Sequence, residues 1–193
     1  MPALVYLHGF NSSPGSIKAR QLLRHLATLP NPPELYVPML PYSPAQAIAK
    51  LDRLCALLPG DDTTLIGSSL GGYYATWLAE QHGCRAVLVN PAVRPYDDLA
   101  RYLGPNRNLY TGETYDLAPH HFDQLRALKV QRITRPERYW LLAQTGDEVL
   151  DYRAAVALYA GARQTVIEGG DHGFQNFESH LGELLRFAGC ASS

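Results

Sequence analysis

The sequence has no excess of charge of either sign and no long hydrophobic run. Its 193 residues carry 17 Lys and Arg against 18 Asp and Glu, a formal net charge of -1. Nucleic acids and anionic membranes recruit proteins through positive charge, so this balance predicts neither partner. A membrane-spanning helix needs about 18 consecutive apolar residues, and no such run is present.

Cysteine is also scarce. Cys55, Cys84 and Cys190 are odd in number and far apart, and none is in a Cys-x-x-Cys pair. This pattern argues against a disulfide framework and against a zinc site, and we expect neither a metal nor a cofactor. The first residues lack the basic and apolar segments of a signal peptide and read as a strand. Together with the unpaired cysteines, this makes a cytoplasmic location the expectation.

What the sequence does contain is an alternation of short β-rich runs with longer runs of helical spacing. Such alternation predicts an α/β domain with a mainly parallel sheet and helices on both faces, and we expect one domain over residues 1–193. The six predicted strands are Ala3–Leu7, Glu34–Val37, Thr63–Gly67, Ala86–Asn90, Tyr139–Gln144 and Arg163–Glu168. The main predicted helices are Ser16–Leu29, Ser43–Leu58, Leu70–Gln81, Phe122–Val130, Asp151–Ala160 and Phe177–Phe187.

The alternation lapses over residues 92–138, which are rich in Pro, Gly, Tyr and charge. A segment this long is not an ordinary connection between elements. We predict a cap-like insertion over one end of the sheet, where it would shape specificity.

The strongest chemical signal is a G-x-S-x-G pattern at residues 67–71, between a predicted strand and a predicted helix. A strand-to-helix turn this tight strains its central residue and lifts the hydroxyl above the carboxyl ends of the strands. Small residues two before and two after relieve the clash. The context predicts Ser69 as a nucleophile. Ser68 lacks those neighbours, and the alternative is that both serines serve only as loop and helix cap.

A nucleophilic serine needs a histidine as general base, late in the chain. His172 lies in the loop that leaves the last predicted strand, whereas His180 falls in the final helix. We therefore predict His172 as the base.

The base in turn needs an acid. Asp147 directly follows the strand Tyr139–Gln144, on the rim where Ser69 is expected, and Asp151 and Glu148 are its rivals. The chain order Ser, Asp, His is that of the three-layer α/β-hydrolase fold, which we predict here, with six strands and a cap.

Two backbone N–H groups would hold the oxyanion. One belongs to Leu70, the residue after the nucleophile, and the other to Phe10, in the loop after the first strand. His8 is interpreted as a structural imidazole that bonds the backbone of this loop.

Several blocks resemble the YqiA-type bacterial esterases, over nearly the whole chain. They are YLHGFNSSP (6–14), GSSLGGYYATW (67–77), NPAVRP (90–95), YTG (110–112), TGDEVLDYR (145–153) and Gln164–His172. The resemblance implies a compact α/β-hydrolase fold without the first two strands of the full fold. It also implies esterase activity, with acyl thioesters such as acyl-CoA as possible substrates, and a triad at Ser69, Asp147 and His172. One departure is Asp171, where the family has Asn.

Three residues are candidate substrate contacts: Tyr73, Arg94 and Tyr110. The tyrosines would line an acyl pocket, and Arg94 would bind a phosphate-bearing leaving group. Aromatic packing and a solvated, charge-balanced surface are the alternatives. The expected partner is a small-molecule ester or thioester. A peptidase, a perhydrolase or a non-catalytic binding protein would keep the same fold, and the sequence gives no oligomeric state.

Overall fold

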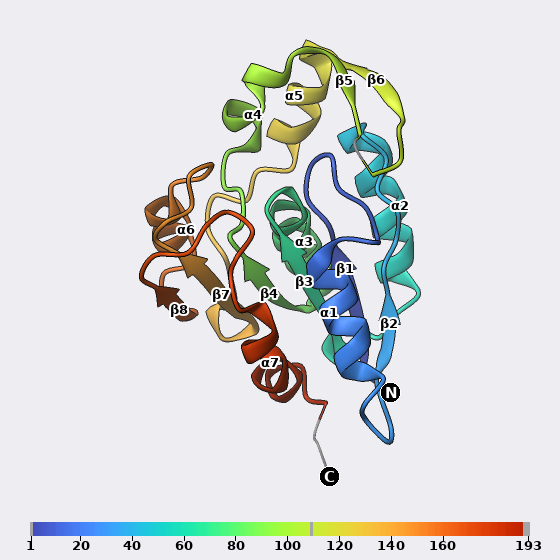
Figure 1. Cartoon of the computed structure of the whole chain (residues 1–193), viewed down its shortest axis with the longest axis vertical. Coiled ribbons are helices and arrows are strands. Elements are labelled where there is room, and N and C mark those ends of the chain that lie inside the picture. The colour runs from blue at the N-terminus through green and yellow to red at the C-terminus, as the bar shows by residue number, and fades with distance from the viewer. Residues whose placement is uncertain (1, 109, 191–193) are drawn as a thin grey trace.

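Six parallel strands form the central sheet in this computed structural model, which describes residues 2–108 and 110–190 (Figure 1). Met1 and the last three residues of the predicted domain lie outside the described residues. The strand order is β2-β1-β3-β4-β7-β8. The bounds are β1 Ala3–Leu7, β2 Glu34–Tyr36, β3 Thr63–Ser68, β4 Arg85–Val89, β7 Tyr139–Gln144 and β8 Arg163–Ile167. The predicted strands are confirmed, with ends moved by one residue at most.

Helices cover both faces of this sheet. The helices are α1 Ile17–Leu26 and α7 Leu181–Phe187 on one face, and α2 Pro44–Ala56, α3 Leu70–His82 and α6 Tyr152–Leu158 on the other. Side chains of a strand alternate between faces, so β1 feeds two separate cores. Leu4 and Tyr6 pack with α1 and α7, whereas Val5 and Leu7 pack with α2 and α3.

Two predicted helices differ in their bounds. Helix α5 spans Pro119–Ala127 and begins before the predicted Phe122. Pro119 suits the first helical position, and His121 Nδ1 accepts the backbone N–H of Ala118 at 2.9 Å, so the helix can start earlier. The last predicted helix is a 3₁₀ turn, Phe177–His180, followed by α7. No helix within the described ranges is long and apolar enough to cross a membrane.

The segment predicted as a cap contains a strand pair that the sequence did not predict. Strands β5 (Gly104–Arg107) and β6 (Thr114–Leu117) pair antiparallel, after a short helix α4 (Pro95–Asp98). Strand β5 begins with Gly and Pro, which have low β-propensity, so its sequence does not indicate a strand. In Figure 1, α4, α5 and this hairpin lie together beyond the end of the sheet where α3 begins.

Candidate active site

Ser69 lies on a sharp turn between β3 and α3. Its backbone has φ 53° and ψ -120°, a conformation that a non-glycine residue adopts only when its surroundings impose it. Its N–H donates to the carbonyl of Val89 at 3.1 Å, and its carbonyl accepts from Gly72 N–H at 2.9 Å. A Cβ on Gly67 would lie 2.6 Å from the Cα of Gly72, so only glycine fits there. The turn therefore has the geometry that the G-x-S-x-G pattern predicts.

The structure brings Ser69, His172 and Asp147 into one hydrogen-bonded row. His172 Nε2 lies 3.1 Å from Ser69 Oγ, and His172 Nδ1 lies 2.9 Å and 3.0 Å from the two carboxylate oxygens of Asp147. The side chain of Asp147 is 2% exposed, and that of His172 is 25% exposed. The three residues follow β3, β7 and β8, so they share the carboxyl edge of the sheet.

Asp147 is held as an anion despite its burial. Burial by itself raises the pKa of this carboxyl, but hydrogen bonds from the His172 ring and from the N–H groups of Leu150 and Val149 outweigh it. The net result is a pKa below the ordinary aspartate value. An ionised carboxylate beside Nδ1 favours the tautomer that leaves Nε2 free to accept a proton from Ser69.

The rival acids have other partners. Asp151 Oδ1 accepts the backbone N–H of Arg153 at 3.0 Å and caps α6. Glu148 Oε2 accepts the backbone N–H of His172 at 3.0 Å, so it supports the histidine without touching its ring. His180 packs against the rings of Trp140 and Phe174, on the face covered by α7.

Sequence reasoning missed Asn90, a buried amide at the end of β4. Its Nδ2 donates to the carbonyls of Asp171 at 2.9 Å and His172 at 3.2 Å, and its Oδ1 accepts from Gln144 N–H at 2.9 Å. Its φ of 40° is one that Asn tolerates better than most residues.

Gln144, the last residue of β7, was missed as well. Its Oε1 accepts the N–H groups of Asp171 at 3.2 Å and Gln175 at 2.9 Å, and its Nε2 donates to Gln175 O at 3.0 Å. The sequence signal that could have found Gln144 is a long polar side chain at the last position of a buried strand.

Phe10 N–H, one predicted oxyanion donor, belongs to a peptide beside Ser69. A Cβ on Gly9 would lie 3.2 Å from Ser69 Cβ. His8 Nε2 accepts Leu40 N–H at 3.2 Å, so the ring proton is on Nδ1, which donates to Gly9 O at 3.0 Å. The carbonyl and N–H of a trans peptide point in opposite directions, so His8 fixes the direction of Phe10 N–H. The second predicted donor, Leu70 N–H, opens α3 directly after Ser69.

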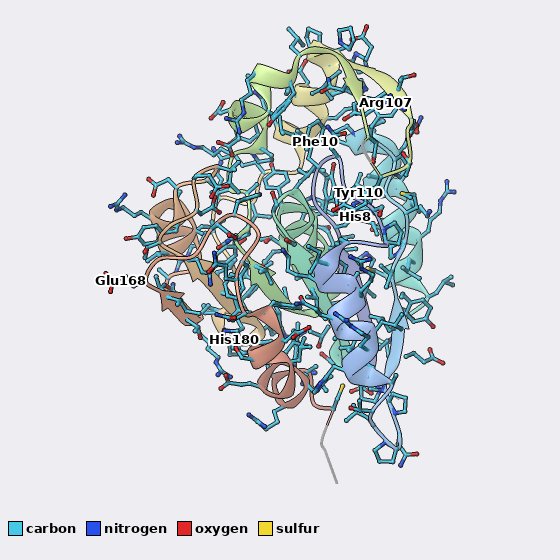
Figure 2. The ribbon with its side chains drawn as sticks, viewed as in Figure 1. His8, Phe10, Arg107, Tyr110, Glu168 and His180 are labelled. Atoms are coloured by element: carbon cyan, nitrogen blue, oxygen red, sulfur yellow. The ribbon has the colours of Figure 1, made fainter. Side chains whose placement is uncertain are left out.

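Two hollows meet at Ser69, and Phe10 and His172 line both. The apolar hollow, about 170 Å³, is lined mainly by Leu70, Ala92, Pro95, Leu99, Val149 and Leu150, with Asp98 and Arg101 as its charged residues. The polar hollow, about 460 Å³, is lined by Tyr6, Ser16, Lys18, Ser68, Tyr110 and Asp171 among others. Figure 2 shows Phe10 and Tyr110 on separate segments that converge here, the loop after β1 and the turn after β5.

The three predicted substrate contacts lie in different places. Tyr110 lines the polar hollow and is 57% exposed. Tyr73 is buried, and its hydroxyl donates to the carbonyl of Leu125 at 2.7 Å, so it packs beneath the cap segment instead. Arg94 extends into solvent and faces Asp97 at 3.8 Å, outside both hollows. The predictions for Tyr73 and Arg94 are thus corrected to packing and to a solvated surface pair.

Metal-binding side chains do not cluster in the part of the chain that the structure describes. There, no three His, Cys, Asp or Glu side chains lie close enough together to hold an ion.

Comparison with protein families matches residues 3–189 to the model described as uncharacterised protein family UPF0227. The UPF0227 protein YcfP of Salmonella arizonae is 26% identical over 191 residues, which cover 95% of this chain and 97% of that protein. A UPF0227 protein of Shewanella woodyi is 29% identical over 100 residues, which span 50% of this chain and 54% of the Shewanella protein.

Solved structures share the architecture at low identity. Mouse alpha/beta hydrolase domain-containing protein 10 superimposes with a TM-score of 0.70 at 16% identity, over 96% of this chain and 87% of the mouse chain. The esterase domain of a Rhodothermus marinus protein superimposes with a TM-score of 0.66 at 19% identity, over 95% of this chain and 84% of the Rhodothermus chain. These likenesses confirm the predicted α/β-hydrolase fold.

Proposed function

The chain belongs to the UPF0227 family, and we propose that it is a serine hydrolase that cleaves carboxylic esters or acyl thioesters. The observation that carries the proposal is the row from Ser69 Oγ through His172 to Asp147, with contacts of 3.1 Å and 2.9 Å. Nucleophile, base and orienting acid within hydrogen-bonding distance are what acyl transfer through a serine requires.

In the first half of the proposed reaction, Ser69 Oγ attacks the acyl carbonyl carbon while its proton passes to His172 Nε2. The carbonyl oxygen becomes an oxyanion, held by the N–H groups of Phe10 and Leu70. The bond to the leaving oxygen or sulfur then breaks, and the leaving group takes the proton from His172. Ser69 remains acylated, and Asp147 stabilises the charged imidazole throughout.

In the second half, water takes the place of the departed alcohol or thiol. His172 removes a proton from the water, which attacks the acyl carbon, and the acid product leaves as Ser69 recovers its proton. The proposed steps use only Ser69, His172, Asp147, the two backbone N–H groups and one water.

The apolar hollow supports an acyl group on one side of Ser69. Its 170 Å³ is less than the roughly 300 Å³ at which pockets for drug-sized ligands begin, so short acyl chains fit best. Part of its wall comes from Pro95, Leu99 and Tyr102, which lie in the segment 92–138. We assign that segment as a cap within a single domain, acting on specificity. Cys55, Cys84 and Cys190 are free thiols, which suits the reducing cytoplasm that we propose as the location.

One panel of substrates tests the proposal. It contains p-nitrophenyl esters of increasing chain length, acyl-CoAs and an aminoacyl-nitroanilide, each incubated with wild type and with Ser69→Ala. We expect turnover of short esters, and a loss of at least about 10³-fold in Ser69→Ala. The same turnover in the variant, or none in wild type, would contradict the proposal. Nitroanilide cleavage would favour a peptidase, and peracid formation from the acid and peroxide a perhydrolase.

A matched pair of carboxylate variants tests the role of the acid. Asp147→Asn removes the negative charge beside His172 and should lower kcat by about 10³–10⁴-fold. Asp151→Asn is the same change four residues later, at a helix cap away from the imidazole. It should keep kcat near wild type and cost about 1 kcal/mol or less of stability. Equal losses in the two variants would remove Asp147 from the mechanism.

A further inference from the structure

Helix α1 begins without the cap that its sequence provides. Ser16 occupies the N-cap position, yet its side chain accepts no backbone N–H of the first turn. The first N–H groups of a helix have no partner within the helix, and a serine here usually accepts one of them. Ser16 is 9% exposed, and no described residue lies in good hydrogen-bonding geometry to its Oγ, although the Tyr6 hydroxyl is its neighbour. The first turn also carries no acidic residue.

The polar hollow opens against this uncapped helix start and extends to Ser69 and His172. Two further groups donate into it. Tyr6 lines it beside the hydroxyls of Ser16 and Ser68, and burial raises the pKa of this phenol to about 12 although these hydroxyls partly oppose the shift, so it keeps its proton. Lys18 Nζ gives one hydrogen bond to Gly173 O at 2.6 Å, which leaves two of its three N–H groups.

Charge in the hollow is set by few groups. Among the residues that line the hollow, Lys18 is the one basic side chain of the lysine or arginine type, and Asp171 is the one carboxylate. Gln175 Nε2 donates to the Asp171 carboxylate at 2.8 Å, so part of the capacity of this acid is already satisfied. The dipole of α1 adds partial positive charge where Ser16 stands. Donors and positive charge therefore concentrate at the α1 end of the hollow.

We propose that the α1 end of the polar hollow, formed by Tyr6, Ser16 and Lys18, binds a carboxylate or phosphate group of the substrate. This proposal rests on the proposed function and adds a substrate class to it: a short apolar acyl group joined to an anionic leaving group. His172 must protonate the leaving atom. It lines both hollows, so the rest of its loop assigns the sides. Residues 171–176, the loop that carries His172, form the wall facing α1, so the leaving group lies in the polar hollow and the acyl group in the apolar one.

Three chromogenic esters test the proposal. They are 4-nitrophenyl butyrate, 3-carboxy-4-nitrophenyl butyrate with the anion on the leaving group, and mono-4-nitrophenyl glutarate with the anion on the acyl group. Each kcat/KM is divided by the rate of alkaline hydrolysis of the same ester. We expect the leaving-group carboxylate to raise this corrected value about tenfold over the neutral ester, and the acyl carboxylate to lower it. Equal values for the first two esters, or a preference for the glutarate, would overturn the proposal.

Single substitutions identify the residues that produce the preference for an anionic leaving group. Lys18→Met should reduce the preference for the carboxylate leaving group about tenfold, and Ser16→Ala about threefold. Asp171→Asn removes the competing negative charge and should increase the preference. Arg20→Met removes the same charge from an exposed position of the same helix and should keep the wild-type preference. A purely structural role of Lys18 would lower both esters equally and leave their ratio unchanged, which contradicts the proposal.

Binding measured without turnover separates this proposal from the proposed function. Calorimetry of 3-carboxy-4-nitrophenol with wild type, Lys18→Met and Arg20→Met should show binding weakened only by Lys18→Met. The same titration with inorganic phosphate distinguishes a phosphate site from a carboxylate site. Binding without hydrolysis of any ester would keep the anion site and reject the esterase. Hydrolysis of neutral esters without any anion binding would keep the esterase and reject the anion site.

Discussion

At the scale of single residues, His8 is a buried imidazole that holds the loop after β1 through hydrogen bonds. It accepts from Leu40 through Nε2 and donates to Gly9 through Nδ1, and only the neutral ring can do both. Burial lowers the pKa of His8 below 6.5, an effect that the Gly9 hydrogen bond partly opposes and the positive charge of Lys50 reinforces. The neutral form is therefore part of the folded loop.

The lowered pKa of His8 predicts a pH dependence of stability. Between the lowered pKa and the ordinary value of about 6.5, the unfolded chain binds a proton that the folded chain does not. The contribution is therefore complete above about pH 6.5 and is lost as the pH falls toward the folded pKa. We expect the free energy of unfolding in urea to fall between about pH 7.5 and pH 5.5, and less steeply in His8→Asn.

A matched control separates this effect from other histidines. His25→Asn on α1 removes an imidazole that lies outside the loop after β1 and should leave the slope unchanged. His121 has a pKa lowered by burial, so some dependence remains in every variant. An identical slope in wild type and His8→Asn would contradict the prediction.

At the scale of elements, the loop that carries His172 is held by the ends of the neighbouring strands. Asn90 at the end of β4 and Gln144 at the end of β7 together give the loop five hydrogen bonds and are joined by a sixth. Both side chains are almost fully buried, Asn90 at 3% and Gln144 at 2% exposed. An unpaired buried polar group costs about 1–3 kcal/mol, so the loop has few alternative positions.

Gln144→Leu should therefore impair catalysis more than folding. Without the amide, the loop loses three hydrogen bonds, and a displacement of His172 by about 1 Å is enough to cost about 10²-fold in rate. We expect kcat for a short ester to fall about 10–100-fold with little change in KM, and the free energy of unfolding to fall by about 1–3 kcal/mol.

Gln164→Leu is the matched control for this variant. Gln164 on β8 also uses a side-chain amide to hold backbone, donating to the carbonyls of Val156 and Tyr159 at 3.0 Å and 2.8 Å. These bonds tie α6 to the sheet, so the change should destabilise the protein while kcat stays near wild type. If both variants lose the same activity, the loss comes from instability and not from the position of His172.

The elements also show what the sequence was able to predict. Ser69, Asp147 and His172 each follow a buried strand closely, and parallel strands bring their carboxyl ends to one edge, so their meeting followed from chain order. The side-chain amides of Asn90 and Gln144 act through tertiary contacts with a loop far along the chain, which no local pattern encodes. Tyr73 lies on a helix buried all round, where spacing does not show which way a side chain points.

At the scale of the whole molecule, the segment 92–138 is joined to the loop that carries Phe10. The Tyr115 hydroxyl donates to Asn11 Oδ1 at 2.5 Å, and Asn108 Nδ2 donates to Ser12 O at 3.0 Å. Phe10 itself packs against Tyr102 with ring centroids 5.2 Å apart. The segment and the loop that carries Phe10 thus form one side of the candidate site, although nearly a hundred residues separate them in sequence.

This arrangement predicts that the cap segment limits the length of the acyl chain. Leu99 lines the apolar hollow next to α4, and a larger side chain there would occupy part of its volume. For Leu99→Trp we expect the ratio of kcat/KM for p-nitrophenyl hexanoate to that for the acetate to fall about tenfold, which corresponds to about 1.4 kcal/mol of lost binding. Leu103→Trp is the control, because Leu103 is 55% exposed and outside the hollow. A ratio that stays constant in Leu99→Trp, or falls equally in both variants, would place the acyl chain elsewhere.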